Sequence, residues 1–96
     1  MSTKKVTAEM INDLFALIAQ IGSAEDMQDL FADLCTNKEI EQMAQRLAAA
    51  KMLMNGMTYQ DVIGQTDISS ATLSRVSRCV QYGKGYSRFL SGEEKA

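Results

Sequence analysis

The segment from Leu47 to Met54 contains one polar residue, Lys51, and this run constrains the fold more than any other feature of the sequence. Thr36-Asn37-Lys38-Glu39 has the hydroxyl-to-acid spacing of a capping box, and Gly56 is a typical helix stop. We therefore predict one long helix from about residue 37 to residue 55. Its second half needs cover on nearly every side, whereas its first half shows only one apolar stripe.

A chain of 96 residues offers few other helices that can cover this run. Such a chain forms one small domain and buries only about 60–65% of the surface that it exposes when unfolded. We therefore predict a single domain over residues 1–96 and expect a second subunit to supply part of the cover. The chain is then a homodimer. The alternative is a central helix buried within a monomeric bundle.

The rest of the chain predicts short helices joined by tight turns, and hence an all-α fold. The sequence contains no proline, and glycines such as Gly22 and Gly83 stand where apolar periodicity stops. The predicted helices cover residues 8–21, 24–35, 58–65 and 69–82, followed by one or two turns over 86–90 and a frayed end over 91–96. Ser23 and Thr58 begin capping patterns, and Ser69 or Ser70 caps the last long helix.

The composition argues against catalysis and against a metal site. The chain has no histidine, the side chain best suited to proton transfer near neutral pH, and it has no phosphate-binding glycine loop or nucleophile elbow. Cys35 and Cys79 match no CxxC spacing, so we predict no metal and no cofactor. Two free thiols, with no leader and no long apolar run, predict a cytoplasmic protein that contacts no membrane.

The charge is unevenly distributed along the chain, although its net value is only -2. Residues 1–68 contain five Lys or Arg against ten Asp or Glu. Residues 69–92 contain no acid and four basic residues, Arg75, Arg78, Lys84 and Arg88. A basic segment on an acidic body is typical of a DNA reader, because association depends on the local field. The same split also fits two faces of a dimer that pair with each other.

The helices predicted over about residues 58–82 have the punctuation of a helix-turn-helix. Ile68, Leu73 and Val76 lie where the second helix must press on the first. The opposite face carries Ser70, Ala71, Ser74, Arg75 and Arg78. Small residues let a helix approach base edges closely, and arginine binds guanine or phosphate. The alternative is a plain helical bundle with a solvated face of arginine and serine.

Several apolar or reactive side chains have two interpretations, of which packing is the simpler. Tyr82 and Tyr86, beside Lys84, either touch nucleic acid or close a dimer core. Cys79 is either a redox sensor or a small packing residue. Six methionines suit gaps in a dimer core better than a ligand box: Met10, Met27, Met43, Met52, Met54 and Met57.

Six sequence motifs resemble the Trp repressor superfamily, and in particular its YerC/YecD branch. They are Glu39-Ile40, Ala44-Gln45-Arg46-Leu47, the Gly56 stop, Ser70-Ala71-Thr72-Leu73-Ser74-Arg75-Val76, Arg78-Cys79 and Tyr82-Gly83. The resemblance covers about residues 10–86. It implies an all-α, interlocked homodimer whose helix-turn-helix units read a two-fold symmetric operator on double-stranded DNA. It also implies that Gln60, Ser70, Ala71 and Ser74 face bases, with Arg75 near phosphate and corepressor.

The resemblance further implies a ligand position between Arg46 and Arg75, which match the arginines that sandwich tryptophan in the repressor. Val76 stands where the tryptophan-sensing repressor has glycine, so its isopropyl group takes the space of the indole. Asp67 replaces the usual turn glycine, and Asp visits left-handed backbone more readily than most residues. We therefore expect no response to tryptophan, and the identity of any other small-molecule corepressor stays open.

Together these observations predict a sequence-specific DNA-binding transcriptional regulator, and not an enzyme. The alternative is a dimeric protein-protein interaction module built on the same helix-turn-helix scaffold. The net acidity of the chain favours that alternative slightly.

Overall fold

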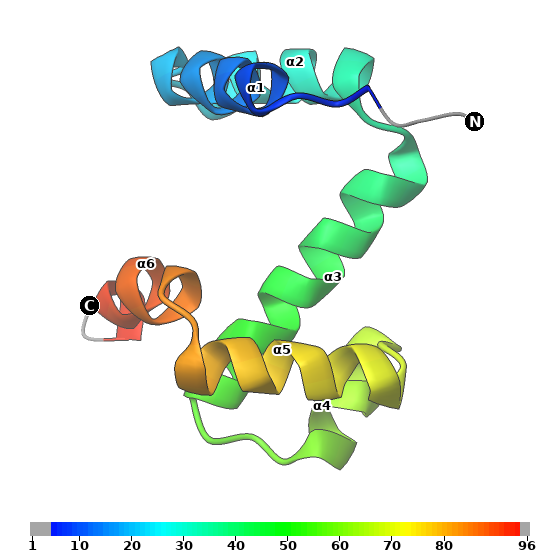
Figure 1. Ribbon diagram of the computed structural model, residues 1–96. Coiled ribbons are helices and arrows are strands. Elements are labelled where there is room, and N and C mark those ends of the chain that lie inside the picture. The colour runs from blue at the N-terminus through cyan, green and yellow to red at the C-terminus, as the bar shows by residue number, and fades with distance from the viewer. Residues whose placement is uncertain (1–4, 95–96) are drawn as a thin grey trace. The chain divides into compact units, whose positions relative to one another are not determined.

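Six α-helices form the described part of the chain, residues 5–94 of the computed structural model, and that part contains no strand. Their order is α1 (Ala8–Gln20), α2 (Ala24–Leu34), α3 (Asn37–Met54), α4 (Tyr59–Thr66), α5 (Ser70–Tyr82) and α6 (Gly85–Glu94) (Figure 1). The predicted all-α class is confirmed. The chain divides into two compact units, unit 1 up to Asn37 and unit 2 from Lys38.

Side-chain caps fix the starts of four helices. Each hydroxyl oxygen accepts a hydrogen bond from a backbone N–H in the first turn, which would otherwise have no partner. The pairs are Thr7 with Met10 at 3.1 Å, Ser23 with Asp26 at 3.0 Å, Thr58 with Asp61 at 3.1 Å and Ser69 with Thr72 at 3.1 Å. Ser69, and not Ser70, is therefore the cap of α5. The Thr7 cap escapes the sequence prediction because no acid or glutamine stands three residues after it.

Left-handed backbone occurs at two turns of unit 2. Among the described glycines only Gly56 has a positive φ, of 88°, and among the other described residues only Asp67 does, with a φ of 63°. The expected left-handed conformation of Asp67 is thus confirmed. Gly22 directly follows Ile21, the C-cap of α1, as the sequence predicts, but its φ is not positive and the cap itself is extended backbone with a φ of -86°.

Unit 1 has no interior of its own. Neither α1 nor α2, both described over their full length, contains a buried residue. Exposed apolar side chains of this unit are Val6, Met10, Ile11, Leu14, Phe15, Leu17 and Leu34. Phe15 alone is 62% exposed. The helices α1 and α2 therefore leave much of their apolar surface uncovered.

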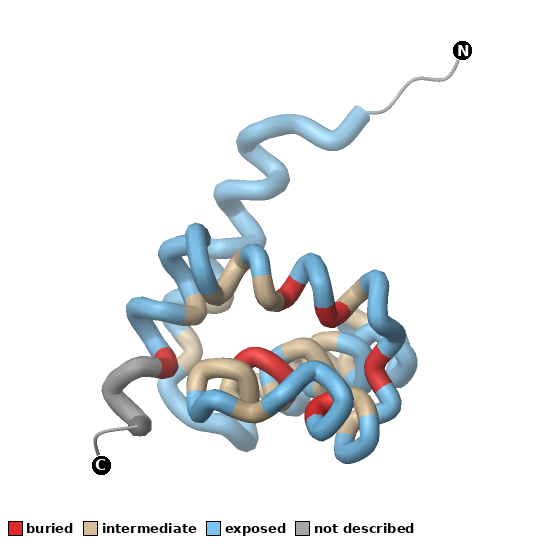
Figure 2. Tube along the Cα trace, turned by 90° about the horizontal axis from the view of Figure 1, so that it is seen from below, coloured by how far each residue is buried: buried red, intermediate tan, exposed pale blue. Residues whose placement is uncertain are grey.

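Unit 2 contains all of the buried residues of the described chain (Figure 2). They are Ala49 and Ala50 on α3, Val62 on α4, Ile68 in the following turn, Leu73 and Val76 on α5, and Leu90 on α6. A hydrogen bond of 2.9 Å from Gln45 Nε2 to the Thr66 carbonyl oxygen ties α3 to the end of α4. The helix-turn-helix is therefore fixed to the second half of α3 by packing and to Gln45, near the middle of α3, by one directed bond.

The apolar run in α3 is only partly covered within one chain. Ala49 and Ala50 are fully buried, and Met52, Leu53 and Met54 are half-buried against the core. Leu47, at the start of the run, is 42% exposed. One chain therefore covers most of the run, leaving Leu47 exposed and five of its residues half-buried, and cover by a second subunit stays a prediction.

The C-terminal helix is longer than the sequence analysis predicts. The turns expected over residues 86–90 are part of α6, which continues to Glu94, so the prediction of fraying from residue 91 is wrong for residues 91–94. Residues 95–96 lie outside the described part of the chain. Leu90 explains the difference, because it is 8% exposed and packs into the core, and tertiary packing overrides the weak helix preference of the Ser-Gly pair after it.

Candidate nucleic-acid interface

Buried apolar side chains hold α5, the second helix of the helix-turn-helix, against its neighbours. Ile68 and Val76 are each 2% exposed and Leu73 is fully buried, while Val80 is half-buried against the same core. The predicted packing stripe is confirmed. It holds α5 against α4 and α6 and fixes which face of α5 points outward.

The outward face of α5 carries the residues that the sequence analysis assigns to DNA. Ser70, Ala71, Ser74, Arg75 and Arg78 are all exposed. Gln60 is also exposed, in the first turn of α4, which contacts α5. The structure therefore places five of the six side chains on one helix face and the sixth on the adjacent helix. Their role in DNA contact stays a prediction.

The electrostatics of this face are one-sided. The first turn of α5 contains no acid, and no Asp or Glu occurs between Asp67 and Glu93. The unpaired N–H groups at a helix start carry partial positive charge, which adds to the charge of Arg75 and Arg78. The outward face of α5 itself therefore carries positive charge and no acid, with Asp61 and Asp67 as the exposed acids nearest to it in the sequence.

The predicted ligand position is divided between exposed and buried groups. Arg75 is exposed on α5, and Arg46 is half-buried on α3. Val76 lies on the inner face of α5, is 2% exposed and belongs to the main hydrophobic cluster. The space on this side of α5 is thus occupied by protein in the described structure. Among the described residues, no group of three or more Cys, Asp or Glu could hold a metal ion.

The two tyrosines at the end of α5 and the start of α6 have different environments. Tyr86 is half-buried and packs against the core, whereas Tyr82 is 80% exposed. Both rings have the same two interpretations in the sequence, because periodicity alone does not separate them across the break at Gly83. A signal for Tyr82 was nevertheless available, since it lies four residues after Arg78 and so shares its helix face.

These features define a helical protein with an exposed, basic helix-turn-helix. The family model for the Trp repressor protein matches residues 9–94. The chain therefore belongs to the Trp repressor family, as the sequence motifs predict. This is a family of DNA-binding regulators with a helix-turn-helix fold.

Three relatives support this assignment. The uncharacterized protein YerC of Bacillus subtilis (strain 168) is 41% identical over 83 residues, which are 86% of this chain and 80% of YerC. A crystal structure of a TrpR-like protein from Eubacterium eligens superposes with a TM-score of 0.85 at 36% identity, covering 91% of each chain. A Trp repressor-like protein from Staphylococcus aureus superposes with a TM-score of 0.84 at 35% identity, covering 92% of this chain and 89% of that one.

Within residues 5–94, no helix combines the length and the apolar character that a membrane span requires.

Proposed function

We propose that this protein is a homodimeric transcriptional regulator that reads a two-fold symmetric DNA operator through α5. The observation that carries the proposal is the outward face of α5, where Ser74, Arg75 and Arg78 are exposed while Leu73 and Val76 lock the helix to the core. A recognition helix needs this combination, because its contacts with bases depend on a rigid and fixed orientation.

The proposed roles follow from chemistry and position. Four side chains face base edges in the major groove: Gln60, Ser70, Ala71 and Ser74. The hydroxyl and amide groups donate and accept hydrogen bonds there, and the alanine methyl can contact thymine. Arg75 and Arg78 supply the charge that phosphate contacts require, with Arg78 further along the helix from its start. Reading by α5 and anchoring by arginine together give both sequence preference and affinity.

The proposed homodimer rests on apolar surface that one chain leaves exposed. Met10, Leu14 and Phe15 of α1 and Leu47 of α3 are each at least 36% exposed. Two helices with no buried residue gain little packing energy alone, since apolar burial contributes about 25 cal/mol per Å². A second copy supplies a matching set of such faces, and we propose that residues 1–96 then form one domain per chain within the dimer.

We further propose that the regulator does not use tryptophan as a corepressor. This proposal is supported by the burial of Val76, whose side chain fills the position next to Arg75.

We also propose that the chain acts in the cytoplasm, where its DNA partner lies. Its two cysteines, Cys35 and Cys79, are free thiols, which suit a reducing setting.

Selection of bound duplexes from a random DNA pool tests the proposal. The full chain is incubated at about 150 mM salt with and without tryptophan and other amino acids. We expect a two-fold symmetric consensus whose half-site centres lie about 34–36 Å, or one helical turn, apart. The same consensus should emerge with and without tryptophan.

Two variants make the selection decisive. Arg78→Ala removes a charge from the outward face of α5, and Lys38→Ala removes one from an exposed position on α3. Arg78→Ala should weaken binding to the selected duplex, and Lys38→Ala should leave it nearly unchanged. Recovery of no enriched sequence from folded wild-type protein would refute the proposal and favour a protein-protein interaction module.

A further inference from the structure

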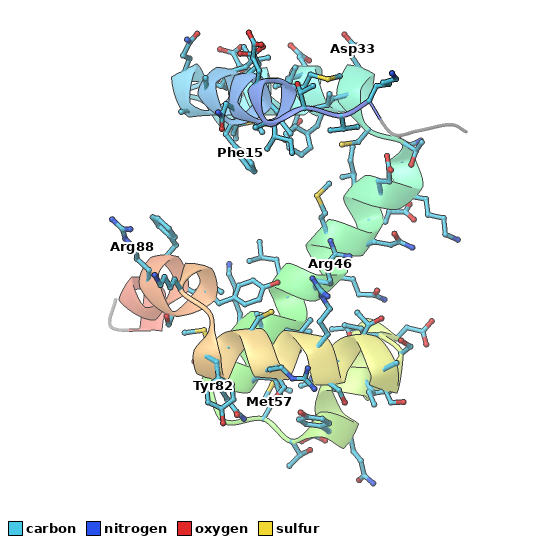
Figure 3. All side chains as sticks on the ribbon, in the orientation of Figure 1. Phe15, Asp33, Arg46, Met57, Tyr82 and Arg88 are labelled. Atoms are coloured by element: carbon cyan, nitrogen blue, oxygen red, sulfur yellow. The ribbon has the colours of Figure 1, made fainter. Side chains whose placement is uncertain are left out.

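The outward face of α5 continues past the predicted contact residues. Ala71, Arg75, Arg78 and Tyr82 follow one another at intervals of four, three and four residues, which places them on a single stripe of the helix. Tyr82 is 80% exposed, more than any other large hydrophobic side chain whose exposure stands out in the described chain. Figure 3 shows its ring projecting from the last turn of α5, away from α6.

Packing does not account for this side chain. The core next to it is filled by Val80, Tyr86 and Leu90, which are buried or half-buried. A tyrosine combines an apolar ring with a polar hydroxyl, and such side chains are enriched at binding interfaces. Tyr82 is therefore available for contact with a partner outside the chain.

The backbone that carries Tyr82 is held firmly. The Gly83 N–H donates to the Cys79 carbonyl oxygen at 2.8 Å and closes the last turn of α5. A Cβ atom at residue 83 would lie 2.7 Å from that oxygen, so only glycine fits this close approach. Ser87 Oγ also donates to the Gly83 carbonyl oxygen at 3.3 Å, which ties the turn to α6. The position of the Tyr82 backbone is thus set before any partner binds.

The surroundings of Tyr82 favour a nucleic acid over a protein partner. Arg75 and Arg78 precede it on the stripe and Lys84 follows it, all three exposed, and no acid lies between Asp67 and Glu93. A protein partner would bury apolar side chains against this stripe. Besides Tyr82, however, the stripe offers only one small alanine and two arginines, which give such side chains little apolar surface to pack on. The phenol hydroxyl is a hydrogen-bond donor, and tyrosine is among the side chains that bind DNA phosphate.

We propose that the Tyr82 hydroxyl donates a hydrogen bond to a phosphate oxygen of the DNA backbone, one helical turn beyond Arg78. This inference rests on the proposed function, since it assigns a further contact of the same DNA-reading face. The bond sets the register of α5 in the groove, because it fixes the far end of the helix while the first turns read bases. Tyr82 is therefore a positioning residue that adds no charge to the interface.

The test compares the salt dependence of DNA binding for three single variants. Tyr82→Phe removes only the hydroxyl, Arg78→Ala removes a charge on the same stripe, and Tyr86→Phe is the matched control, because it removes a hydroxyl from a half-buried ring off the stripe. Affinity for the selected duplex is measured by fluorescence anisotropy over a range of salt concentrations. Circular dichroism and light scattering check that each variant keeps its fold and mass.

We expect Tyr82→Phe to weaken binding by about threefold to tenfold per recognition helix at every salt concentration, with an unchanged slope. The slope stays constant because a neutral donor releases no counterions. Arg78→Ala should reduce the slope by about one, and Tyr86→Phe should match wild type. Replacing single phosphates by methylphosphonate should then reveal one position per half-site where wild type loses more affinity than Tyr82→Phe.

Three results would overturn the inference, and they are distinguishable from a failure of the proposed function. If Tyr82→Phe binds with wild-type affinity, the proposed hydroxyl contact is ruled out, while the proposed regulator function stands. A lower mass for Tyr82→Phe assigns the ring to a protein interface. Wild-type protein that binds no selected duplex overturns the regulator and the Tyr82 contact together.

Discussion

Arg75 and Val76 are neighbours in the sequence but occupy opposite environments. Arg75 is exposed on the outward face of α5, and Val76 is 2% exposed within the core. Successive positions on a helix are separated by about 100°, so the boundary between the two faces falls between these two residues. Substitutions on either side of the boundary should therefore have different consequences, one for binding and one for the interior.

On the outward face, Ser74→Ala should change which bases are preferred, whereas Arg78→Ala should mainly lower affinity. A base-facing hydroxyl discriminates between bases by about 1–3 kcal/mol, and each phosphate contact contributes about one to the salt slope. Repeating the selection with each variant and measuring salt titrations checks both effects. Identical preferences and slopes in both variants would contradict the assignment of α5 as the recognition helix.

On the inner face, the natural protein should bind no tryptophan, because Val76 occupies the space that the ring would need. Forcing extra atoms into a packed core costs about 1–3 kcal/mol, although a ring between Arg46 and Arg75 would gain cation-π attraction. Calorimetry up to millimolar tryptophan should show no heat of binding, and operator affinity should not change. Val76→Gly should gain binding if its fold survives, with Val76→Ala as the milder control. A saturable micromolar isotherm for the natural protein contradicts the prediction.

At the scale of helices, the caps decide where elements begin. Ser69 Oγ accepts from the Thr72 N–H at 3.1 Å and donates to Thr72 Oγ1 at 2.9 Å. These two bonds hold the first turn of α5, the turn from which the base-facing residues extend. The stability of that turn is therefore separable from the contacts that it presents.

Ser69→Ala should destabilise the protein by about 0.5–2 kcal/mol, because it leaves a first-turn N–H without its partner. Ser70→Ala is the matched control, since Ser70 is the exposed next residue and has no capping role. Thermal unfolding followed by circular dichroism should show a lower Tm for Ser69→Ala only. Equal midpoints for the two variants would show that the Ser69 cap contributes nothing.

Local chemistry is why most of these elements are predictable. The bounds of α1 to α5 agree with the predicted helices to within about two residues, because caps, glycines and apolar spacing all act within a few residues. The packing stripe of α5 is predictable for the same reason. The length of α6 is not, because it depends on Leu90 meeting a core formed by α3, α4 and α5. The exposure of Tyr82 likewise depends on what fills the space beside it.

At the scale of the whole molecule, the uncovered apolar side chains of unit 1 and of Leu47 in α3 dominate. Phe15 is 62% exposed and Leu47 is 42% exposed. A folded chain rarely leaves so many large apolar groups in water without a partner to cover them. The proposed homodimer accounts for them with the same surface on both subunits, as a two-fold interface requires.

The unfolding midpoint of the protein should therefore rise with protein concentration, because association stabilises the folded chain by mass action. Light scattering at micromolar concentration should give the mass of two chains. Phe15→Ser should weaken association, and Asp29→Asn, which changes an exposed polar residue of α2, should not. A monomer mass across the micromolar range would end the homodimer proposal.

The absence of buried residues in α1 and α2 has a consequence for control in the cell. On the proposed homodimer, the apolar faces of these helices are covered only when two chains meet, so at low supply the concentration of the dimeric, active regulator rises with the square of the amount synthesised. Newly made chains that have not met a partner then present unprotected segments to proteases. The rates at which the chain is made and degraded thus set how much active dimer is present, without any small molecule.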